Sequence, residues 1–386
     1  MSFSSLKNVK ISAVYTDVPK KEISIEDELE YYGGSLKRAK RMQKIIGVHK
    51  RRVGYPDITA SDLCFSAAER LFEEQDIDKN DIDTLIFVSQ HPDYQLPATA
   101  CVLQHRLKLS TACACFDVNQ GCAGYVYGLW LASSLISAGG AKKILLLAGD
   151  SNTAPLPASN RVISPIFGDG GSATLLEFDC TAAPISFSIG TDGSGYDAII
   201  APGGASRIPY ASDFEGNEDF FKDIQAEDGT PWRLNSIYMD GQAVFDFSLN
   251  VVPAHLQKFM EQNQITPDDV DWLFLHQANK QIVENISGKT GFSIEKAPVD
   301  AFCKYGNLYS ASIPSIISET LGEVEEVRQQ KILLCGFGVG LTWASCLFQA
   351  DGLKCSPVAD YGIPDDALSR DELIDYWKKR FQNKDK

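Results

Sequence analysis

The sequence predicts a layered α/β fold made of two related halves. Two pairs of similar segments recur at one displacement: DIDTLIFV from Asp81 with DVDWLFLH from Asp269 (269 minus 81, or 188), and KILLLAG from Lys143 with KILLCGF from Lys331 (331 minus 143, again 188). Their apolar runs are continuous, as in strands that are covered on both faces. The repetition therefore indicates two similar sheets with helices on their faces.

A third pair of segments sets the boundaries of the halves. FGDGGSATLLEF begins at Phe167 and FGVGLTWASCLF at Phe337, a displacement of 170 (337 minus 167), which implies about 18 extra residues (188 minus 170) near 150–166. We therefore expect a first half over 1–182, a second half over 183–352 and a C-terminal extension over 353–386.

The helices that the sequence predicts have recognisable ends. A cap-like turn at 59–61 starts one and two glycines follow another; the predicted helices are Ser61–Gln75, Cys122–Ala138 and Pro314–Leu321. Segment 191–236 has no counterpart in the first half and is rich in Gly, Pro and Asp, so we expect loops that cap a site or an interface. The charged run DELIDYWKKRF in the extension predicts a helix that packs on the surface.

The composition limits the classes of partner. With 386 residues, 44% of them hydrophobic and 23% charged, the chain fits a globular protein of two domains or of two similar halves. Its net charge of -15 argues against nucleic acid as a main partner, because phosphate binding needs a basic face. The basic cluster between Lys37 and Arg52 is an exception, and it indicates either a solvated helix face or a dock for a phosphorylated or acidic partner.

The sequence gives no sign of a membrane or export segment. Its first residues lack the apolar core of a signal peptide, and no run of about 18 uncharged apolar residues occurs. The ten cysteines stand mostly in apolar runs without the spacing of a metal site. We therefore expect a cytoplasmic protein with reduced thiols, no zinc and no membrane contact.

Cys122 is a candidate nucleophile because it stands where a strand-like run ends and a long helix begins. The unpaired N–H groups and the dipole of a helix N-terminus stabilise a thiolate, so the position predicts a lowered thiol pKa. Taken alone, a cysteine here can equally be a packing residue. The displacement of 188 sets Ser310 against Cys122, so the repeated scaffold does not itself require a cysteine.

The second half offers two further candidates at matching junctions. His276 ends the apolar run WLFLH, and Asn307 lies in KYGNLYSASIPS. Alone, the first reads as a packed histidine and the second as a turn or cap residue. Pseudo-twofold symmetry brings equivalent junctions together, so we expect Cys122, His276 and Asn307 in one cavity. A thiol with an imidazole and an amide can attack a carbonyl and donate hydrogen bonds to the developing negative charge.

Several motifs resemble those of one family. The runs DVNQGCAGYVYG, FGDGGSATLLE, YMDGQAVF, VDWLFLHQAN, YGNLYSASIPS and GFGVGLTWAS are similar to those of the 3-oxoacyl-[acyl-carrier-protein] synthase III family of thiolase-like condensing enzymes, from about Asn8 to Phe348. The resemblance implies a thiolase-like fold with two mixed sheets and layered helices (αβαβα), a homodimer, and a catalytic triad of Cys122, His276 and Asn307.

The resemblance also implies an acyltransferase reaction in the biosynthesis of fatty acids or of related lipids and polyketides. Cys122 would take an acyl group from an acyl-coenzyme A or an acyl carrier protein, with the N–H groups of Cys122 and Val339 as oxyanion hole. His276 and Asn307 would then stabilise the enolate that forms when malonyl-acyl-carrier-protein loses CO2. Coenzyme A or phosphopantetheine thioesters are expected as substrates, with no metal or redox cofactor.

The same resemblance assigns residues to substrate binding. Asn279 would contact the pantetheine arm, and Phe337 would sit beside the cysteine. Leu96 occupies the position from which, in members of the family, a residue of one subunit reaches into the acyl pocket of the other. Arg41 replaces the family's aromatic residue that stacks on adenine, which favours an acyl-carrier-protein donor. The arginine with which members of the family often grip the carrier protein falls near Asn250 here, so docking is expected at the basic cluster.

One further departure concerns the C-terminal glycine loop. The family's middle glycine is Val339, and because valine tolerates positive φ poorly, we expect an ordinary backbone there and a narrower approach to the cavity.

Two alternative functions stay open from the sequence. One keeps the acyl-cysteine and transfers the acyl group to a hydroxyl or an amine. The other is a non-catalytic thiolase-fold binding protein, which the presence of all three triad residues disfavours. A papain-like hydrolase does not fit the repeat.

Overall fold

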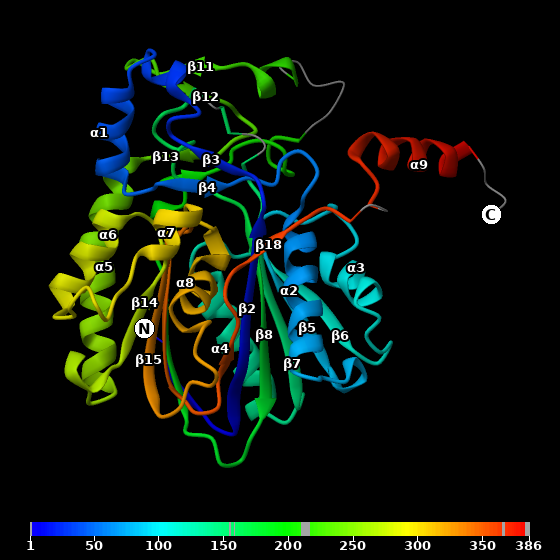
Figure 1. The fold of residues 1–386 in the computed structure, drawn as a ribbon, viewed down its shortest axis with the longest axis vertical. Coiled ribbons are helices and arrows are strands. Elements are labelled where there is room, and N and C mark those ends of the chain that lie inside the picture. Colours follow the sequence, from blue (N-terminus) through cyan, green and yellow to red (C-terminus); the bar gives the residue numbers. More distant parts are fainter. Residues whose placement is uncertain (1, 154–155, 158, 210–216, 365–366, 383–386) are drawn as a thin grey trace.

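The computed structural model has the αβαβα layers that the sequence predicts (Figure 1). It describes residues 2–153, 156–157, 159–209, 217–364 and 367–382. The first sheet has the order β17-β2-β8-β7-β5-β6, with β18 also paired to β2; its strands are β2 (Val9–Pro19), β5 (Thr84–Val88), β6 (Ala114–Val118), β7 (Lys143–Asp150), β8 (Gly170–Phe178), β17 (Lys354–Cys355) and β18 (Ala359–Tyr361). The second has the order β1-β9-β16-β15-β14, made of β1 (Ser2–Leu6), β9 (Ile185–Thr191), β14 (Trp272–Leu275), β15 (Gln330–Gly338) and β16 (Thr342–Ala350).

Helices lie between the two sheets and on both outer faces (Figure 1). The central layer is α4 (Gly124–Ser137) and α8 (Ser312–Leu321), the first sheet is covered by α2 (Ala60–Glu74) and α3 (Thr99–Arg106), and the second by α5 (Gly241–Gln262) and α6 (Lys280–Thr290). The remaining helices are α1 (Leu36–Ile46), α7 (Asp300–Tyr305) and α9 (Arg370–Gln382).

Short elements gather above the sheets, on the side where the strands that lead to the site end (Figure 1). They are the ribbons β3 (Glu22–Ser24) with β4 (Lys50–Arg52), β10 (Ile199–Ile200) with β13 (Tyr238–Met239), and β11 (Ile224–Gln225) with β12 (Pro231–Trp232). Segment 191–236, expected as capping loops, contributes β10, β11 and β12, and its residues 210–216 lie outside the described part of the chain.

The continuous apolar strands are explained by burial on both faces. Along β5, Ile86 and Val88 face the central helices, whereas Leu85 and Phe87 face α2 and α3. Strand β15 alternates in the same way between the central layer and α5. Full burial of such a side chain contributes about 1.5–3 kcal/mol, so both faces of each strand support the fold.

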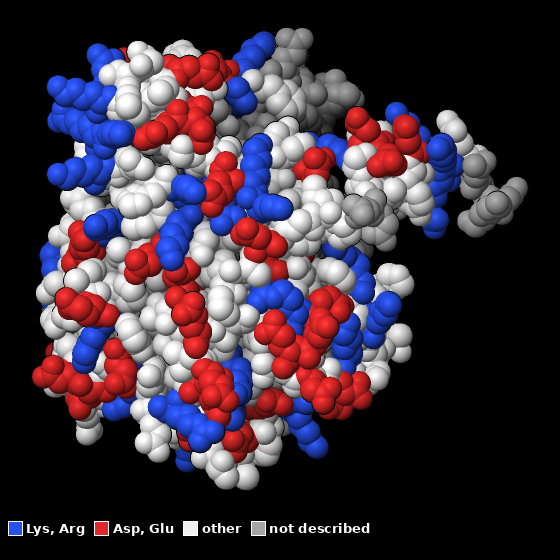
Figure 2. Space-filling model, viewed as in Figure 1, with Lys and Arg blue, Asp and Glu red and all other residues white. Residues whose placement is uncertain are grey.

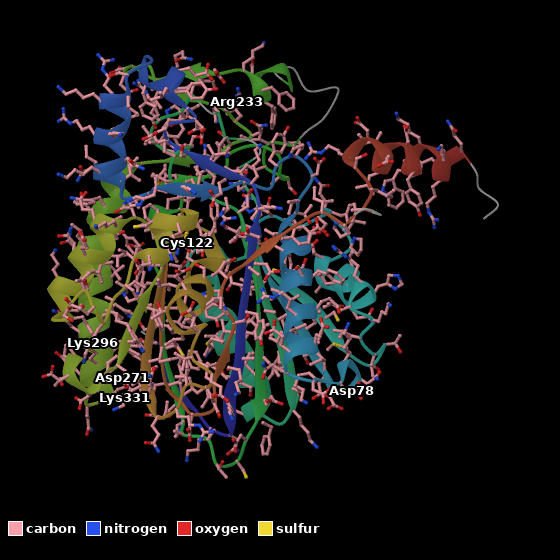
Figure 3. The ribbon with its side chains drawn as sticks, in the orientation of Figure 1. Asp78, Cys122, Arg233, Asp271, Lys296 and Lys331 are labelled. Carbon is pink, nitrogen blue, oxygen red and sulfur yellow. The ribbon has the colours of Figure 1, made fainter. Side chains whose placement is uncertain are left out.

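The repeat of 188 residues is visible in the hydrogen bonding. Asp83 accepts backbone N–H groups of Lys142 and Lys143 at 2.7 and 3.0 Å. Asp271 accepts the N–H of Lys331 at 2.7 Å, and Figure 3 shows these two residues close together. Each carboxylate holds the start of one strand beside its parallel neighbour, β7 beside β5 in the first half and β15 beside β14 in the second.

The equivalent strands β8 and β16 are displaced by 172 residues, not by the 170 that separates the two FG segments. Lys143 pairs with Glu177 in the first sheet, and Lys331 with Gln349 in the second (349 minus 177, or 172). The first half therefore has 16 extra residues (188 minus 172) between the paired strands, not 18. The phenylalanine alignment was wrong because the two FG motifs stand at different distances before their strands.

The two ends of the chain cross the boundary between the halves. Strand β1 pairs antiparallel with β9 of the second half, although it lies within 1–182. Strands β17 and β18, from the extension 353–386, pair parallel with β2 of the first half. Each sheet is thus completed by a segment from the other end of the sequence.

The predicted helices occur, with shifted ends. Helix α2 is capped by Thr59 with a capping box to Asp62, and α4 and α8 begin two residues away from the predicted starts. The prediction for the tail was wrong in one respect: α9 forms, but it projects from the body instead of packing on it (Figure 1), with no buried residue over Arg370–Gln382. Within the described residues, no helix is both long and apolar enough to cross a membrane.

The basic cluster divides into two groups. Arg51 pairs with Glu28, and Arg52 binds Asp360 at 2.7 Å and the carbonyl of Pro19, so these residues join β4 to the rest of the fold. On α1 the basic side chains of Lys37, Arg38, Arg41 and Lys44 form the blue patch over that helix in Figure 2. Only the α1 group is available as a dock.

We predict that removing either carboxylate, that of Asp83 or that of Asp271, lowers the free energy of unfolding. Asp83→Ala and Asp271→Ala each lose carboxylate hydrogen bonds to backbone N–H groups, which should cost about 1 kcal/mol, with the larger loss for Asp83 because it accepts two. Urea unfolding measures both. The exposed Asp268→Ala is the control, and equal midpoints for all three variants would contradict the structural role.

Candidate active site

Cys122 lies in the turn between β6 and α4, two residues before the first helical residue. The N–H of Gly124 bonds to the carbonyl of Gly121 at 2.7 Å, and Ala123 is the N-cap. Strand β15 of the second half presses on this turn, since a Cβ on Gly336 would lie 2.8 Å from the Cα of Ala123. The thiol therefore sits at the junction of the two halves.

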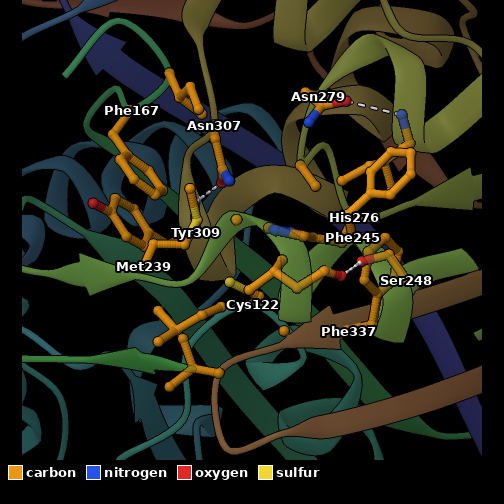
Figure 4. A pocket seen from close by; sticks show the side chains of 18 of the residues that line it. Cys122, Phe167, Met239, Phe245, Ser248, His276, Asn279, Asn307, Tyr309 and Phe337 are labelled. Atoms are coloured by element: carbon orange, nitrogen blue, oxygen red, sulfur yellow. Dashed lines mark hydrogen bonds between the residues drawn. The ribbon is translucent and has the colours of Figure 1, made fainter. Parts of the chain in front are cut away.

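A cavity of about 240 Å³ opens onto the thiol (Figure 4). It combines residues from both halves, and its walls are mostly apolar. The lining comprises Cys122, Val162, Ile166, Phe167, Ile199, Ile237, Met239, Gly241, Val244, Phe245, Ser248, His276, Ala278, Asn279, Ile282, Asn307, Tyr309, Phe337, Gly338 and Val339. Cys122, His276 and Asn307 thus share one cavity, as the symmetry argument predicts.

The predicted direction of the thiol pKa was wrong. Burial raises the pKa of Cys122 to about 12, and the backbone N–H groups of Val339 and Cys122 offset this only in part. The thiol is 6% exposed, so the loss of solvation outweighs the helix N-terminus. Cys122 accordingly rests as a neutral thiol at neutral pH.

His276 is a neutral imidazole in the same cavity. It follows β14 directly, its N–H bonds to the carbonyl of Cys335 at 2.8 Å, and its ring stands edge-on to Phe337 at 5.5 Å. Burial lowers the pKa of His276 to about 3, against smaller opposite effects of the Tyr309 backbone and Asp150. Its Nδ1 has no hydrogen-bond partner within the described residues, which leaves the ring available to a ligand.

Asn307 is held by its backbone and by its side-chain oxygen. Its N–H donates to Ile166 and its carbonyl accepts from Gly168, so the second half is bridged to the first at this residue. The Asn307 Oδ1 accepts the N–H of Tyr309 at 2.9 Å. Because the oxygen is occupied, the amide NH₂ is the end that can donate to a bound molecule.

The backbone N–H groups of Val339 and Cys122 lie close enough to the thiol to lower its pKa. The sequence resemblance assigns the same two groups to an oxyanion hole. Val339 is not among the described residues with positive φ, whereas its neighbour Gly338 has φ 152° and would place a Cβ 2.8 Å from the Cys122 Sγ. The prediction of an ordinary backbone at Val339 is confirmed.

Asn279 and Phe337 both reach the cavity, as expected. Asn279 caps α6 by accepting the N–H of Ile282 at 2.8 Å, which points its amide NH₂ away from the helix (Figure 4). Phe337 is 1% exposed on β15 and packs on His276.

Leu96 and Arg41 lie apart from the thiol. Leu96 is 82% exposed on the loop before α3 and does not line the cavity of its own chain. Arg41 lines a cleft of about 630 Å³ together with Arg38 and Arg161. Val162 lines both this cleft and the thiol cavity, so the arginine cleft adjoins the cavity.

The sequence reasoning missed Asp150 and Tyr309. The fully buried Asp150 accepts bonds from Gln90, His91 and both the N–H and the hydroxyl of Ser310. Tyr309 adopts φ 52°, stacks on Phe167 at 4.6 Å and forms part of the cavity wall. The displacement of 188 gave a clue, since it pointed to Ser310 as a special position.

We predict slow alkylation of Cys122 with a steep pH dependence. Since the raised pKa keeps the thiol protonated, its iodoacetamide rate should rise about tenfold per pH unit from 7 to 9 without a plateau. Peptide mass spectrometry follows the site. The urea-unfolded chain is the control, because a free thiol levels off near pH 8.5; a plateau below pH 8 in the folded protein would restore the expectation of a lowered pKa.

Known proteins match this chain over most of its length. The family model described as 3-oxoacyl-[acyl-carrier-protein (ACP)] synthase III matches residues 116–193, and its C-terminal counterpart matches 260–350. A Campylobacter jejuni protein described as a 3-oxoacyl-[acyl-carrier-protein] synthase 3 is 37% identical over 354 residues, covering 91% of this chain and 97% of the relative. A beta-ketoacyl-[acyl-carrier-protein] synthase III of Natranaerobius thermophilus is 31% identical over 307 residues, covering 78% and 88%.

A solved structure agrees with the fold. The crystal structure of a 3-oxoacyl-(acyl-carrier protein) synthase from Burkholderia xenovorans LB400 superposes with a TM-score of 0.85 at 33% identity, covering 93% of this chain and 99% of that one. The matched family segments contain Cys122 in the first half and His276, Asn307 and Val339 in the second. By sequence and by thiolase-like fold, the chain belongs to the 3-oxoacyl-[acyl-carrier-protein] synthase III family.

Proposed function

We propose that this protein is a condensing enzyme that primes fatty-acid or polyketide synthesis. In this reaction an acyl group is first loaded on Cys122 and then joined to a malonyl thioester with loss of CO2. The observation that carries the proposal is the single cavity in which the thiol, two backbone N–H groups close to it, His276 and Asn307 meet.

The first step forms the acyl-cysteine. The Cys122 sulfur attacks the carbonyl of an acyl thioester, the bond to the donor sulfur breaks, and the thiol proton leaves on the departing thiol. The N–H groups of Cys122 and Val339 stabilise the negative oxygen. Because the thiolate is the nucleophilic form and the dry cavity penalises a free thiolate, the Cys122 thiol must lose its proton during the attack and not before it.

The second step makes the carbon–carbon bond. The malonyl carboxylate leaves as CO2, and its bonding electrons form an enolate whose oxygen accepts hydrogen bonds from His276 and Asn307. The enolate carbon attacks the acyl-cysteine, and the sulfur leaves and regains a proton to give a 3-oxoacyl thioester. The depressed pKa of His276, about 3, keeps the imidazole neutral as a donor.

The arginine cleft beside the cavity favours an acyl donor that carries a phosphate group. Arg38, Arg41 and Arg161 line this cleft, where a coenzyme A or phosphopantetheine phosphate would meet positive charge. Asn279 would contact the pantetheine arm, and Phe337 would sit beside the cysteine. The basic face of α1 (Figure 2) is a suitable dock for an acidic acyl carrier protein.

The proposal includes a homodimer and a cytoplasmic location. The exposed Leu96 is suited to reach the cavity of a second copy, and the outer edge of β6 ends the first sheet. All ten cysteines are free thiols, which fits a reducing compartment. No metal or redox cofactor enters the proposed steps.

A panel of thioesters tests the first step. Incubation with acyl-coenzyme A and acyl-carrier thioesters should add one acyl mass to Cys122, read by intact-protein and peptide mass spectrometry. Cys122→Ala should abolish the adduct, while Cys101→Ala, at an exposed thiol, should retain it. An adduct on another cysteine in the Cys122→Ala variant would contradict the assignment of Cys122 as the nucleophile.

Release of CO2 separates condensation from plain acyl transfer. The enzyme should release CO2 from malonyl-acyl-carrier-protein in step with product, whereas transfer to a hydroxyl or an amine needs no decarboxylation. Acyl-cysteine formation without CO2 release would favour the transfer reaction.

We predict that Asn307→Asp separates the two steps. The new carboxylate can still accept the N–H of Tyr309, but it puts negative charge where the enolate oxygen forms. Malonyl decarboxylation should fall by about 10²–10³ or more, the usual effect of losing such a donor, while loading of Cys122 changes far less. A parallel loss of both steps, with unchanged circular dichroism, would contradict the assigned role.

A further inference from the structure

Helix α9 carries an apolar stripe that the other described residues of the chain leave uncovered. Leu373, Trp377 and Phe381 recur every four residues with Ile374 beside them, so they share one face of the helix. Their exposed fractions are 37%, 39%, 72% and 46% for Leu373, Trp377, Phe381 and Ile374. Such a stripe on a projecting helix marks an interaction surface.

The helix touches the body at its first residue. Arg370 donates to the carbonyl of Pro56 at 2.7 Å and stacks over the ring of Tyr55. Within the described residues, the other hydrogen bonds and ion pairs of α9 are local to Ser369–Arg380. Figure 1 shows the helix extending outward beside α2 and α3, with its length free for a partner.

The charges of α9 are arranged from one end to the other. Its first turn is acidic, with Asp371 and Glu372, and its last turn is basic, with Lys379 and Arg380. An antiparallel copy of the same helix would set each acidic end beside a basic end, whereas a parallel copy would set like charges together. We propose that α9 pairs antiparallel with α9 of a second copy of this chain, centred on Trp377.

The stripe is self-complementary in that register. With the twofold axis at Trp377, the two tryptophans face each other, and Ile374 of one copy lies against Phe381 of the other. Glu372 then lies near Arg380 of the second copy. Both copies use the same patch, so this contact joins two chains and cannot add a third.

A lipid surface fits the helix less well. Membrane-surface helices carry mostly Lys and Arg on the polar face, whereas the face opposite Trp377 mixes Glu372, Asp375 and Lys379. The whole chain has a net charge of -15, which opposes approach to an anionic membrane. The mixed charges favour a partner of equally mixed charge, as a second copy supplies.

Disulfide cross-linking of the full-length chain tests the pairing. Trp377→Cys should give a cross-linked pair under mild oxidation, located by peptide mass spectrometry, because residue 377 faces its own copy. Lys379→Cys, on the opposite face of the same helix, is the matched control, and the wild-type chain gives the background of native thiols. Equal cross-linking of both variants at the introduced cysteine would overturn the proposal.

Mixed variants test the antiparallel register. An equimolar mixture of Ile374→Cys and Phe381→Cys should form the 374–381 cross-link. A parallel pair would instead cross-link each variant to itself, and that result would overturn the register proposed.

Sedimentation velocity supplies an independent readout. Trp377→Glu should weaken self-association at least tenfold across a concentration series relative to the wild-type chain, in which the proposed Leu96 contact is equally present, and loading of Cys122 should stay unchanged because α9 is remote from the cavity. Unchanged self-association would overturn the proposal, as would binding of α9 to anionic phosphatidylserine vesicles without the 377 cross-link.

Discussion

The buried carboxylate of Asp150 holds the site together. It stands at the end of β7, fully buried, and accepts bonds from Gln90 and His91 of the first half and from Ser310 of the second. A buried carboxylate without these donors would be strongly unfavourable, so the segments that supply them are fixed relative to one another. Asn307 and Tyr309 lie on the segment so fixed, and their place beside Cys122 follows from it.

Duplication explains why one scaffold position carries the nucleophile and its equivalent does not. Cys122 and Ser310 are related by the displacement of 188, and both precede a central helix, α4 or α8. In the first half the position faces the cavity, whereas in the second the hydroxyl bonds Asp150 at 2.6 Å. One junction thus carries the proposed nucleophile, and the other bonds the buried Asp150 that holds the two halves together.

The sequence was sufficient for the repeat, the layers and the three cavity residues, because each follows from local apolar pattern or from symmetry. It was not sufficient for β1, β17 and β18, whose pairing depends on where the chain ends meet in space. Asp150 was missed because a carboxylate after an apolar strand looks like an ordinary strand end. The thiol pKa was wrong because burial, which a sequence does not measure, outweighs the helix N-terminus.

The same burial determines the protonation states of Cys122 and His276 in the resting site. It raises the thiol pKa to about 12 and lowers that of His276 to about 3, so both groups are uncharged at neutral pH. Neither then needs a counter-ion in a mostly apolar cavity. In the proposed reaction, the N–H groups of Cys122 and Val339 would act only weakly on the neutral sulfur, but strongly on an oxygen that becomes negative. Their binding energy would then be expressed in the transition state and not in the free enzyme, which is the condition for catalysis.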